Sequence, residues 1–161
     1  CHVCELEVDP ETGAVEICRY TVVEDVGRVM NLTMLTGQFH GGIYQGAGQS
    51  LLEQAVFDES GQPLTGSFMD YAMPRADMMP EPVLRTREVP TKVNPVGAKG
   101  VGEAGTVGSM VCVVNALCDA LDVAHFEMPA TPARVWAAPH IAHPMPPAPE
   151  ASDGRYVAPR A

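Results

Sequence analysis

The apolar stretch at residues 104–121 constrains the fold more than any other part of this chain. Five of its residues recur at helical spacing: Met110, Val113, Val114, Leu117 and Leu121. This spacing places them on one face of an α-helix, which would pack against a core. We therefore predict an amphipathic helix over 104–121, with Thr106 or Ser109 capping its first turn.

A glycine-rich loop, KGVGEAG at residues 99–105, leads directly into this helix. Its glycines have the G-x-G-x-x-G spacing of dinucleotide-binding loops, but those loops follow immediately on a strand. Here Pro90 and Pro95 interrupt the segment before the loop, so a nucleotide-binding module resting on Gly100–Gly105 is a disfavoured alternative. A P-loop is rejected, because no G-K-[ST] sequence occurs.

Glu103 lies inside this loop and has two possible roles. The backbone N–H groups of the loop and the positive end of the helix would both attract an anionic or electron-rich ligand. Glu103 could then act on that ligand. From spacing alone, the simpler interpretation is an acid in the first helical turn that complements the helix dipole.

The first part of the chain has the pattern of a β-hairpin. Residues 1–8 alternate roughly between polar and apolar, and residues 14–24 read as a second strand. The sequence DPETG between them is typical of a turn, in which Gly13 can adopt a positive φ. A further strand is predicted at residues 83–89.

Four glycines, Gly41, Gly42, Gly46 and Gly48, lie in a segment that also has helical character. The apolar residues with helical spacing there are Ile43, Ala47, Leu51 and Ala55. Each glycine inside a helix costs up to about 1 kcal/mol relative to alanine. We infer that the backbone must closely approach another helix or a ligand at this point.

Charge and cysteine content exclude several classes of protein. Twenty acidic against ten basic residues give a net charge of −10, which argues against nucleic acid or an anionic membrane as partner. No uninterrupted apolar run approaches the roughly 18 residues of a transmembrane segment, and no signal peptide is visible. An odd number of cysteines, five, argues against a disulfide framework and for a reducing cytoplasm. The C-x-x-C at residues 1–4 offers too few ligands for a metal site.

The C-terminal end of the chain differs in composition from the rest. Eight of the fifteen prolines lie between residues 129 and 161, and no hydrophobic period is visible there. We therefore predict one domain over 1–137 and a Pro-rich, disordered tail over 138–161.

Three segments of the sequence resemble the molybdenum hydroxylases, the family of xanthine dehydrogenase and aldehyde oxidase. They begin CHVCELEVDPETG, GQFHGGIYQGAGQ and NPVGAKGVGEAGTVG, and they stand in the order and at about the spacing of the family. The resemblance covers about residues 1–136. The strongest resemblance is to the molybdopterin-binding large subunit of aerobic carbon monoxide dehydrogenase and its homologues. This chain corresponds to the C-terminal part of that subunit. The resemblance implies an α+β fold, a portion of a molybdenum cofactor-binding domain in which a mixed sheet with hairpins packs against helices.

The resemblance also implies roles for particular residues. Glu103 corresponds to the catalytic base of the family. The positions that correspond to cofactor contacts are Gln38, Lys99, Gly100, Val101 and Gly102, with His40, Gly41 and Gly42 as weaker candidates. No protein ligand to the metal is expected, because the sulfur atoms of the cofactor hold the molybdenum.

The function implied is that of a molybdopterin-dependent oxidoreductase acting on a small substrate such as CO, an aldehyde or an N-heterocycle. The cofactor would be molybdenum–molybdopterin in its cytosine dinucleotide form. The implied partners are the remainder of the large subunit and the iron–sulfur clusters and FAD on other subunits or segments. The alternative is a truncated, inactive remnant of such a subunit, or an interaction module derived from it.

Overall fold

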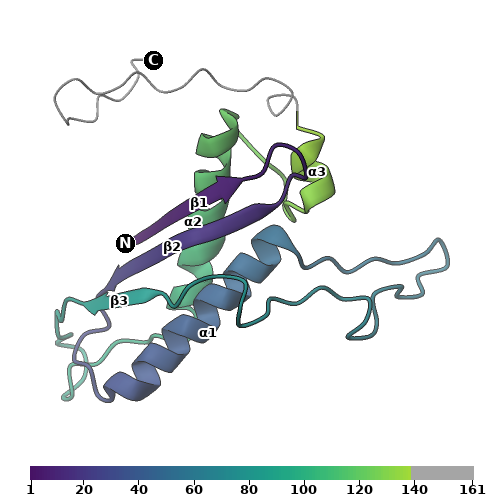
Figure 1. Cartoon of the computed structure of the whole chain (residues 1–161). Helices are drawn as coiled ribbons and strands as arrows, with labels where there is room; N and C mark the ends of the chain where they lie inside the picture. Colours follow the sequence, from purple (N-terminus) through teal and green to yellow (C-terminus); the bar gives the residue numbers. More distant parts are fainter. Residues whose placement is uncertain (139–161) are drawn as a thin grey trace, which may run out of the picture.

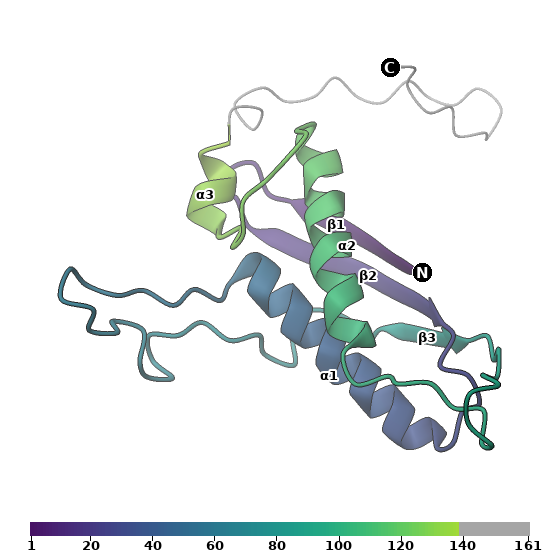
Figure 2. The same cartoon turned by 180° about the vertical axis from the view of Figure 1, so that it is seen from behind.

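The computed structural model describes residues 1–138, which form a small sheet with two long helices packed beside it (Figure 1). The elements in chain order are β1 (His2–Val8), β2 (Val15–Glu24), α1 (Leu32–Leu51), β3 (Val83–Thr86), α2 (Ala104–Leu121) and α3 (Pro132–Trp136). Helix α2 crosses the face of β1 and β2, and α1 packs against α2 (Figure 2). The α+β architecture expected from the sequence is confirmed.

The sheet is mixed and has the order β1-β2-β3. Strands β1 and β2 form the predicted antiparallel hairpin, in which Gly13 turns the chain at a φ of +72°. Strand β3 pairs in parallel with the end of β2, from Val83 opposite Thr21 onward. It is shorter than the predicted 83–89, because its Thr86 already pairs with Glu24, the last residue of β2.

Helix α1 begins earlier than its apolar pattern indicated. Asn31 caps it, since its Oδ1 accepts the N–H of Met34 at 3.0 Å. The helix ends at Leu51, so Ala55, which fits the helical spacing, lies outside it. Residues 52–82 then run out as an extended arm and return to β3 (Figure 1).

Helix α2 has the predicted bounds, but its cap was predicted wrongly. Thr106 and Ser109 lie inside the helix, and the N-cap residue is Glu103, whose side chain makes no capping hydrogen bond. On the packed face, Gly105 and Ser109 are buried together with the predicted Val113, Leu117 and Leu121. Met110 and Val114 are only partly buried, and both line an open groove beside Phe126 and Met128.

The glycines of α1 explain how close the two helices come. A Cβ on Gly42 would lie 3.0 Å from the backbone nitrogen of Thr106, and one on Gly46 would lie 2.7 Å from the carbonyl oxygen of Thr106. In the same way, a Cβ on Gly105 would lie 2.9 Å from the carbonyl oxygen of Phe39. The close approach inferred from the sequence is therefore that of another helix at Gly42 and Gly46.

The short helix α3 closes the end of the core that faces the hairpin turn. Its Val135 is fully buried, and Ala138 is 9 % exposed. The largest fully buried side chains of the core come from β2, α1, α2 and α3: Tyr20, Val22, Phe39, Ile43, Val113, Leu117 and Val135. The disordered tail predicted for 138–161 lies outside the described residues from position 139 onward.

Candidate functional site

The glycine-rich loop is firmly attached at its beginning. Asn94 accepts the N–H of Gly97 through Oδ1 at 2.7 Å and donates through Nδ2 to the carbonyl of Ala98 at 2.9 Å. The N–H of Lys99 donates to the carbonyl of Val26 at 2.9 Å. These bonds hold the backbone of residues 94–99 in place beside the exit of β2.

The end of the same loop is open. A Cβ on Gly100 or on Gly102 would meet no heavy atom within 4 Å. Glu103 is exposed, and within residues 1–138 its carboxylate has no ion-pair partner. The loop therefore presents accessible backbone, a helix N-terminus without a side-chain cap and an available carboxylate at one place.

A pocket of about 250 Å³ lies between this loop and the first half of α1. Gln38 from α1 lines it together with Lys99 and Val101 from the loop. Residues that the sequence places far apart thus come together around one cavity. The other side chains that line it are mostly apolar, and Gly100 and Gly102 are not among the lining residues. The amide of Gln38 can donate hydrogen bonds to a ligand in the pocket, and the open backbone that follows Lys99 and Val101 can do so at its edge.

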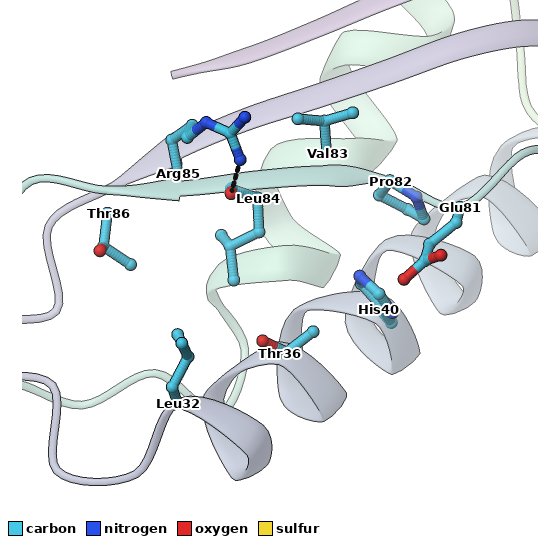
Figure 3. Close-up of a pocket in the computed structure, with 9 residues that line it drawn as sticks. All are labelled: Leu32, Thr36, His40, Glu81, Pro82, Val83, Leu84, Arg85 and Thr86. Carbon is cyan, nitrogen blue, oxygen red and sulfur yellow. Dashed lines mark hydrogen bonds between the residues drawn. The ribbon is translucent and has the colours of Figure 1, made fainter.

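His40 points into a different groove, although it is only two residues from Gln38. Two residues along a helix correspond to a rotation of about 200°. His40 lines a groove of about 660 Å³ between α1 and β3, with Thr36 on its own helix and Glu81 and Arg85 opposite (Figure 3). The structure therefore does not bring His40 together with Gln38 and the glycine-rich loop.

The two remaining candidates on α1 differ in their surroundings. Gly41 is exposed, and a Cβ there would meet nothing within 4 Å. Gly42 is buried under the first turn of α2. Gly42 thus brings the start of α2, and with it Glu103, close to α1.

Gln45 was not selected from the sequence, and it does not line the pocket with Gln38, but it contacts the start of α2. Gln38, Gly42 and Gln45 recur at i, i+4 and i+7, so they share one face of α1. The Oε1 of Gln45 accepts the hydroxyl of Thr106 in the first turn of α2 at 3.2 Å. The helical spacing from Gln38 could have revealed this position.

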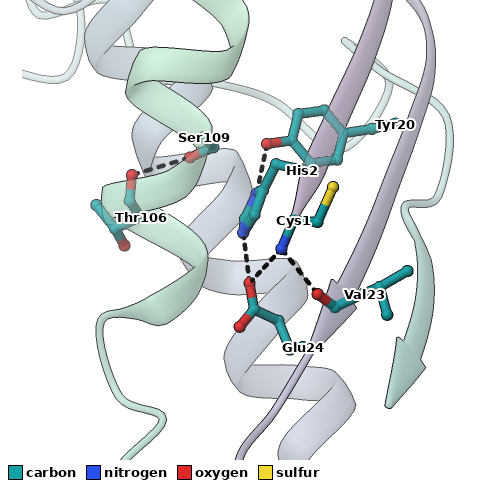
Figure 4. A network of polar contacts seen from close by, with 7 residues as sticks. All are labelled: Cys1, His2, Tyr20, Val23, Glu24, Thr106 and Ser109. Atoms are coloured by element: carbon teal, nitrogen blue, oxygen red, sulfur yellow. Dashed lines mark hydrogen bonds and ion pairs between the residues drawn. The ribbon is translucent and has the colours of Figure 1, made fainter. Parts of the chain in front are cut away.

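A second polar cluster lies between β1, β2 and α2, and it is structural in character. The His2 ring is 2.7 Å from the hydroxyl of Tyr20 through Nδ1 and 2.9 Å from Oε1 of Glu24 through Nε2 (Figure 4). Burial lowers the pKa of His2 and raises that of Tyr20. Gly108 of α2 lies against the His2 ring, where a Cβ would clash with it. The cluster fills the space between the sheet and the helix.

Cys4, Cys112 and Cys118 are partly buried, as packing residues are, whereas Cys1 and Cys18 are exposed. Burial raises the pKa of Cys4 to about 12, which keeps its sulfur protonated and unsuited to metal binding at neutral pH. Within residues 1–138, no three side chains of His, Cys, Asp or Glu are grouped so that they could hold a metal ion.

Comparison with known proteins gives consistent matches. The model of a molybdopterin cofactor-binding domain matches residues 1–80. The nicotine 6-hydroxylase large subunit of Paenarthrobacter nicotinovorans is 39% identical over 137 residues, which cover 83% of this chain and 17% of the relative. The carbon monoxide dehydrogenase large chain of Afipia carboxidovorans is 33% identical over 138 residues, which cover 84% of this chain and 17% of that relative.

Solved structures show the same relationship. The crystal structure of quinoline 2-oxidoreductase from Pseudomonas putida 86 superposes with a TM-score of 0.78 at 36% identity. The match covers 83% of this chain and 17% of that one. The chain therefore spans about one sixth of the length of the relatives that it matches.

Proposed function

The chain belongs to the molybdopterin cofactor-binding domain family of the molybdenum hydroxylases, and from this premise we propose that it forms one wall of a molybdenum-cofactor site. The proposed complete protein is a molybdenum-dependent oxidoreductase, because the named relatives that it matches include dehydrogenases and hydroxylases. The observation that carries the proposal is the convergence of Gln38, Lys99 and Val101 on one pocket, with Glu103 two residues further along the same loop.

The residues present fit such a cofactor. Molybdopterin is a large, anionic ligand, and it would be met here by the amide of Gln38 and by the accessible backbone around Gly100 and Gly102. The positive end of α2 adds a favourable field for negative charge. The pocket of about 250 Å³ is open on one side, so other parts of the subunit would supply the remaining walls.

In the proposed mechanism, Glu103 is the general base. When bound, the molybdenum cofactor accepts the two electrons that the substrate loses. The carboxylate of Glu103 takes up a proton in the same reaction, and Gln38 and the loop backbone orient the cofactor beside it. A carboxylate serves as base most effectively when burial brings its pKa nearer to 7. Glu103 is exposed in this chain, so the complete site would have to bury it.

We also propose that the cofactor is the cytosine dinucleotide form, that iron–sulfur clusters and FAD lie on other subunits or segments, and that the protein is cytoplasmic. The relatives include a nicotine hydroxylase and a carbon monoxide dehydrogenase. The substrate is therefore proposed only as a small molecule, CO, an aldehyde or an N-heterocycle. The alternative remains an inactive remnant or interaction module, in which Glu103 only complements the helix dipole.

The outer surface of α2 supports the proposal that more protein covers this chain. Among residues 1–138, α2 is the one helix long and apolar enough to suit a membrane span, yet it packs against α1 and β1 like a core helix. Val107 and Val111 on its outer side are 59% and 60% exposed. Next to them, Phe126 and Met128 line an apolar groove of about 470 Å³. An exposed apolar surface of this kind is normally covered by a partner, which fits coverage by the rest of the large subunit.

The substitution Val111→Asp tests this coverage. In the isolated chain it should change the free energy of unfolding by less than about 0.5 kcal/mol, because the position is exposed. In the complete subunit it should cost more than about 2 kcal/mol, because an unpaired charge would be buried. Denaturant unfolding of both proteins gives the two values. Equal costs in the two contexts would show that nothing covers this face.

The isolated 161-residue chain is expected not to retain the cofactor, because it supplies only one wall of the site. Molybdenum and pterin analysis after gel filtration should find far less than one equivalent. The same analysis on the chain purified together with the rest of its large subunit should find about one equivalent of each. Stoichiometric molybdenum on the isolated chain would refute the one-wall arrangement, and none in the complete subunit would favour the inactive remnant.

A further inference from the structure

Asp25 joins three segments of the chain immediately after β2. Its Oδ1 accepts the N–H groups of Gly27 at 2.8 Å and of Val89 at 3.1 Å. Its Oδ2 accepts the ammonium of Lys99 at 2.5 Å. One carboxylate thus ties the exit of β2, the segment after β3 and the glycine-rich loop to one another.

The backbone repeats this connection around Asp25. Gly27 pairs with Ala98 in an isolated antiparallel bridge, and the N–H of Arg28 donates to the carbonyl of Gly97 at 2.9 Å. Gly27 has a φ of +66°, and a Cβ there would clash with the carbonyl oxygen of Gly97. The start of the loop is thus hydrogen-bonded to the turn that begins at Asp25. Lys99 is the last loop residue with such a backbone contact before the open part at Gly100 and Gly102.

The ion pair between Asp25 and Lys99 is partly exposed to solvent, which limits its contribution to the stability of the whole fold. The side chains of Asp25 and Lys99 are 34% and 36% accessible. The ammonium of Lys99, followed by the two N–H groups, lowers the pKa of Asp25, so the carboxylate is charged at neutral pH. Ion pairs this exposed add little to global stability. Such a pair acts locally. Here it restrains Lys99, the first residue of the proposed cofactor-binding backbone.

We propose that Asp25 is a positioning residue for the cofactor-binding loop: by holding Lys99 and the turn at Gly27, it fixes the backbone of residues 99–102 and the start of α2. The inference rests on the proposed function, because it takes this loop to be the one that meets the cofactor. It assigns the Lys99 side chain to Asp25, so Lys99 contributes to the site through its backbone.

Hydrogen–deuterium exchange of the full 161-residue chain tests the positioning directly. Asp25→Asn keeps the shape and can still accept the two N–H groups, but it loses the charge that holds Lys99. Amide exchange at positions 97 and 99, whose N–H groups are hydrogen-bonded, should rise by about 10-fold, while exchange within α1 stays unchanged. The matched control is Glu5→Gln, which removes the exposed ion pair with Arg19 on the hairpin and should leave the loop unchanged.

Two variants of the partner residue keep the test independent of any folding defect. Lys99→Met should raise exchange in the loop as Asp25→Asn does, and the double variant should add little further. Lys99→Arg keeps the positive charge and should restore most of the protection. If exchange at positions 97 and 99 is the same in Asp25→Asn, Lys99→Met and the parent chain, the positioning role of Asp25 is wrong.

Cofactor retention in the complete subunit separates this inference from the proposed function. Asp25→Asn should lose molybdenum and pterin faster than the parent during dialysis, whereas Glu5→Gln should not. Faster amide exchange in the loop of Asp25→Asn, with unchanged cofactor retention, would support the proposal that Asp25 positions the loop. That result would at the same time contradict the role of this loop in holding the cofactor.

Discussion

Placing a methyl group on Gly46 should destabilise the fold, whereas the same change at Gly37 should stabilise it. A Cβ on Gly46 would clash with the hydroxyl of Ser109 and lie 2.7 Å from the carbonyl oxygen of Thr106. Ser109 can rotate, but the backbone of α2 cannot move without opening the contact with α1. We expect Gly46→Ala to cost about 1–3 kcal/mol through overpacking, despite its better helix propensity.

Gly37 provides the matched control in the same helix. It is exposed, and a Cβ there would meet nothing within 4 Å. Gly37→Ala should therefore gain up to about 1 kcal/mol from helix propensity alone. Denaturant unfolding of the two variants should show free energies of unfolding that differ by about 1–4 kcal/mol. If the two substitutions have the same effect, α1 and α2 do not pack as closely as described.

The regular elements could be predicted because local patterns determine them. The alternation of 1–8 and 14–24 indicated the hairpin, and apolar spacing gave the bounds of α2. The cap of α2 could not be predicted from residue types. Thr106 and Ser109 are good capping residues, but close packing against Gly42 and Gly46 places them within the helix.

The candidate site was predictable only as a set of segments. Resemblance selected Gln38 and the glycine-rich loop, and of that loop Lys99 and Val101 line one pocket with Gln38, whereas Gly100, Gly102 and Glu103 do not. It also selected His40, which helical geometry turns toward another groove. The role of Asp25 depends on contacts with residues far along the chain, and no local pattern could predict them.

Replacing the proposed base should nearly abolish turnover in the complete enzyme. Glu103→Gln keeps the size and hydrogen-bonding capacity of the side chain but removes its ability to take up a proton. If Glu103 is the base, the turnover number should fall by at least about 100-fold, the usual scale for general-base catalysis. Molybdenum and pterin content should stay near that of the parent enzyme, because the loop would hold the cofactor through its backbone.

A control variant and a stability measurement distinguish a catalytic Glu103 from one that only complements the helix dipole. Glu59→Gln removes an exposed acid in the turn before Gly61, and it should leave turnover unchanged. If Glu103 only complements the helix dipole, Glu103→Gln should cost less than about 1 kcal/mol of stability and leave turnover almost unaffected. A loss of turnover that is matched by a loss of cofactor would point to binding instead of proton transfer.

The most direct test of the account is the single-turnover reduction of the metal centre by substrate in the complete enzyme. Stopped-flow absorbance would compare the parent with Glu103→Gln at equal molybdenum content, so that electron transfer to other carriers and product release do not contribute. The account predicts a reduction rate at least about 100-fold lower in the variant. A Glu103→Gln enzyme with full metal content and a normal reduction rate would contradict it.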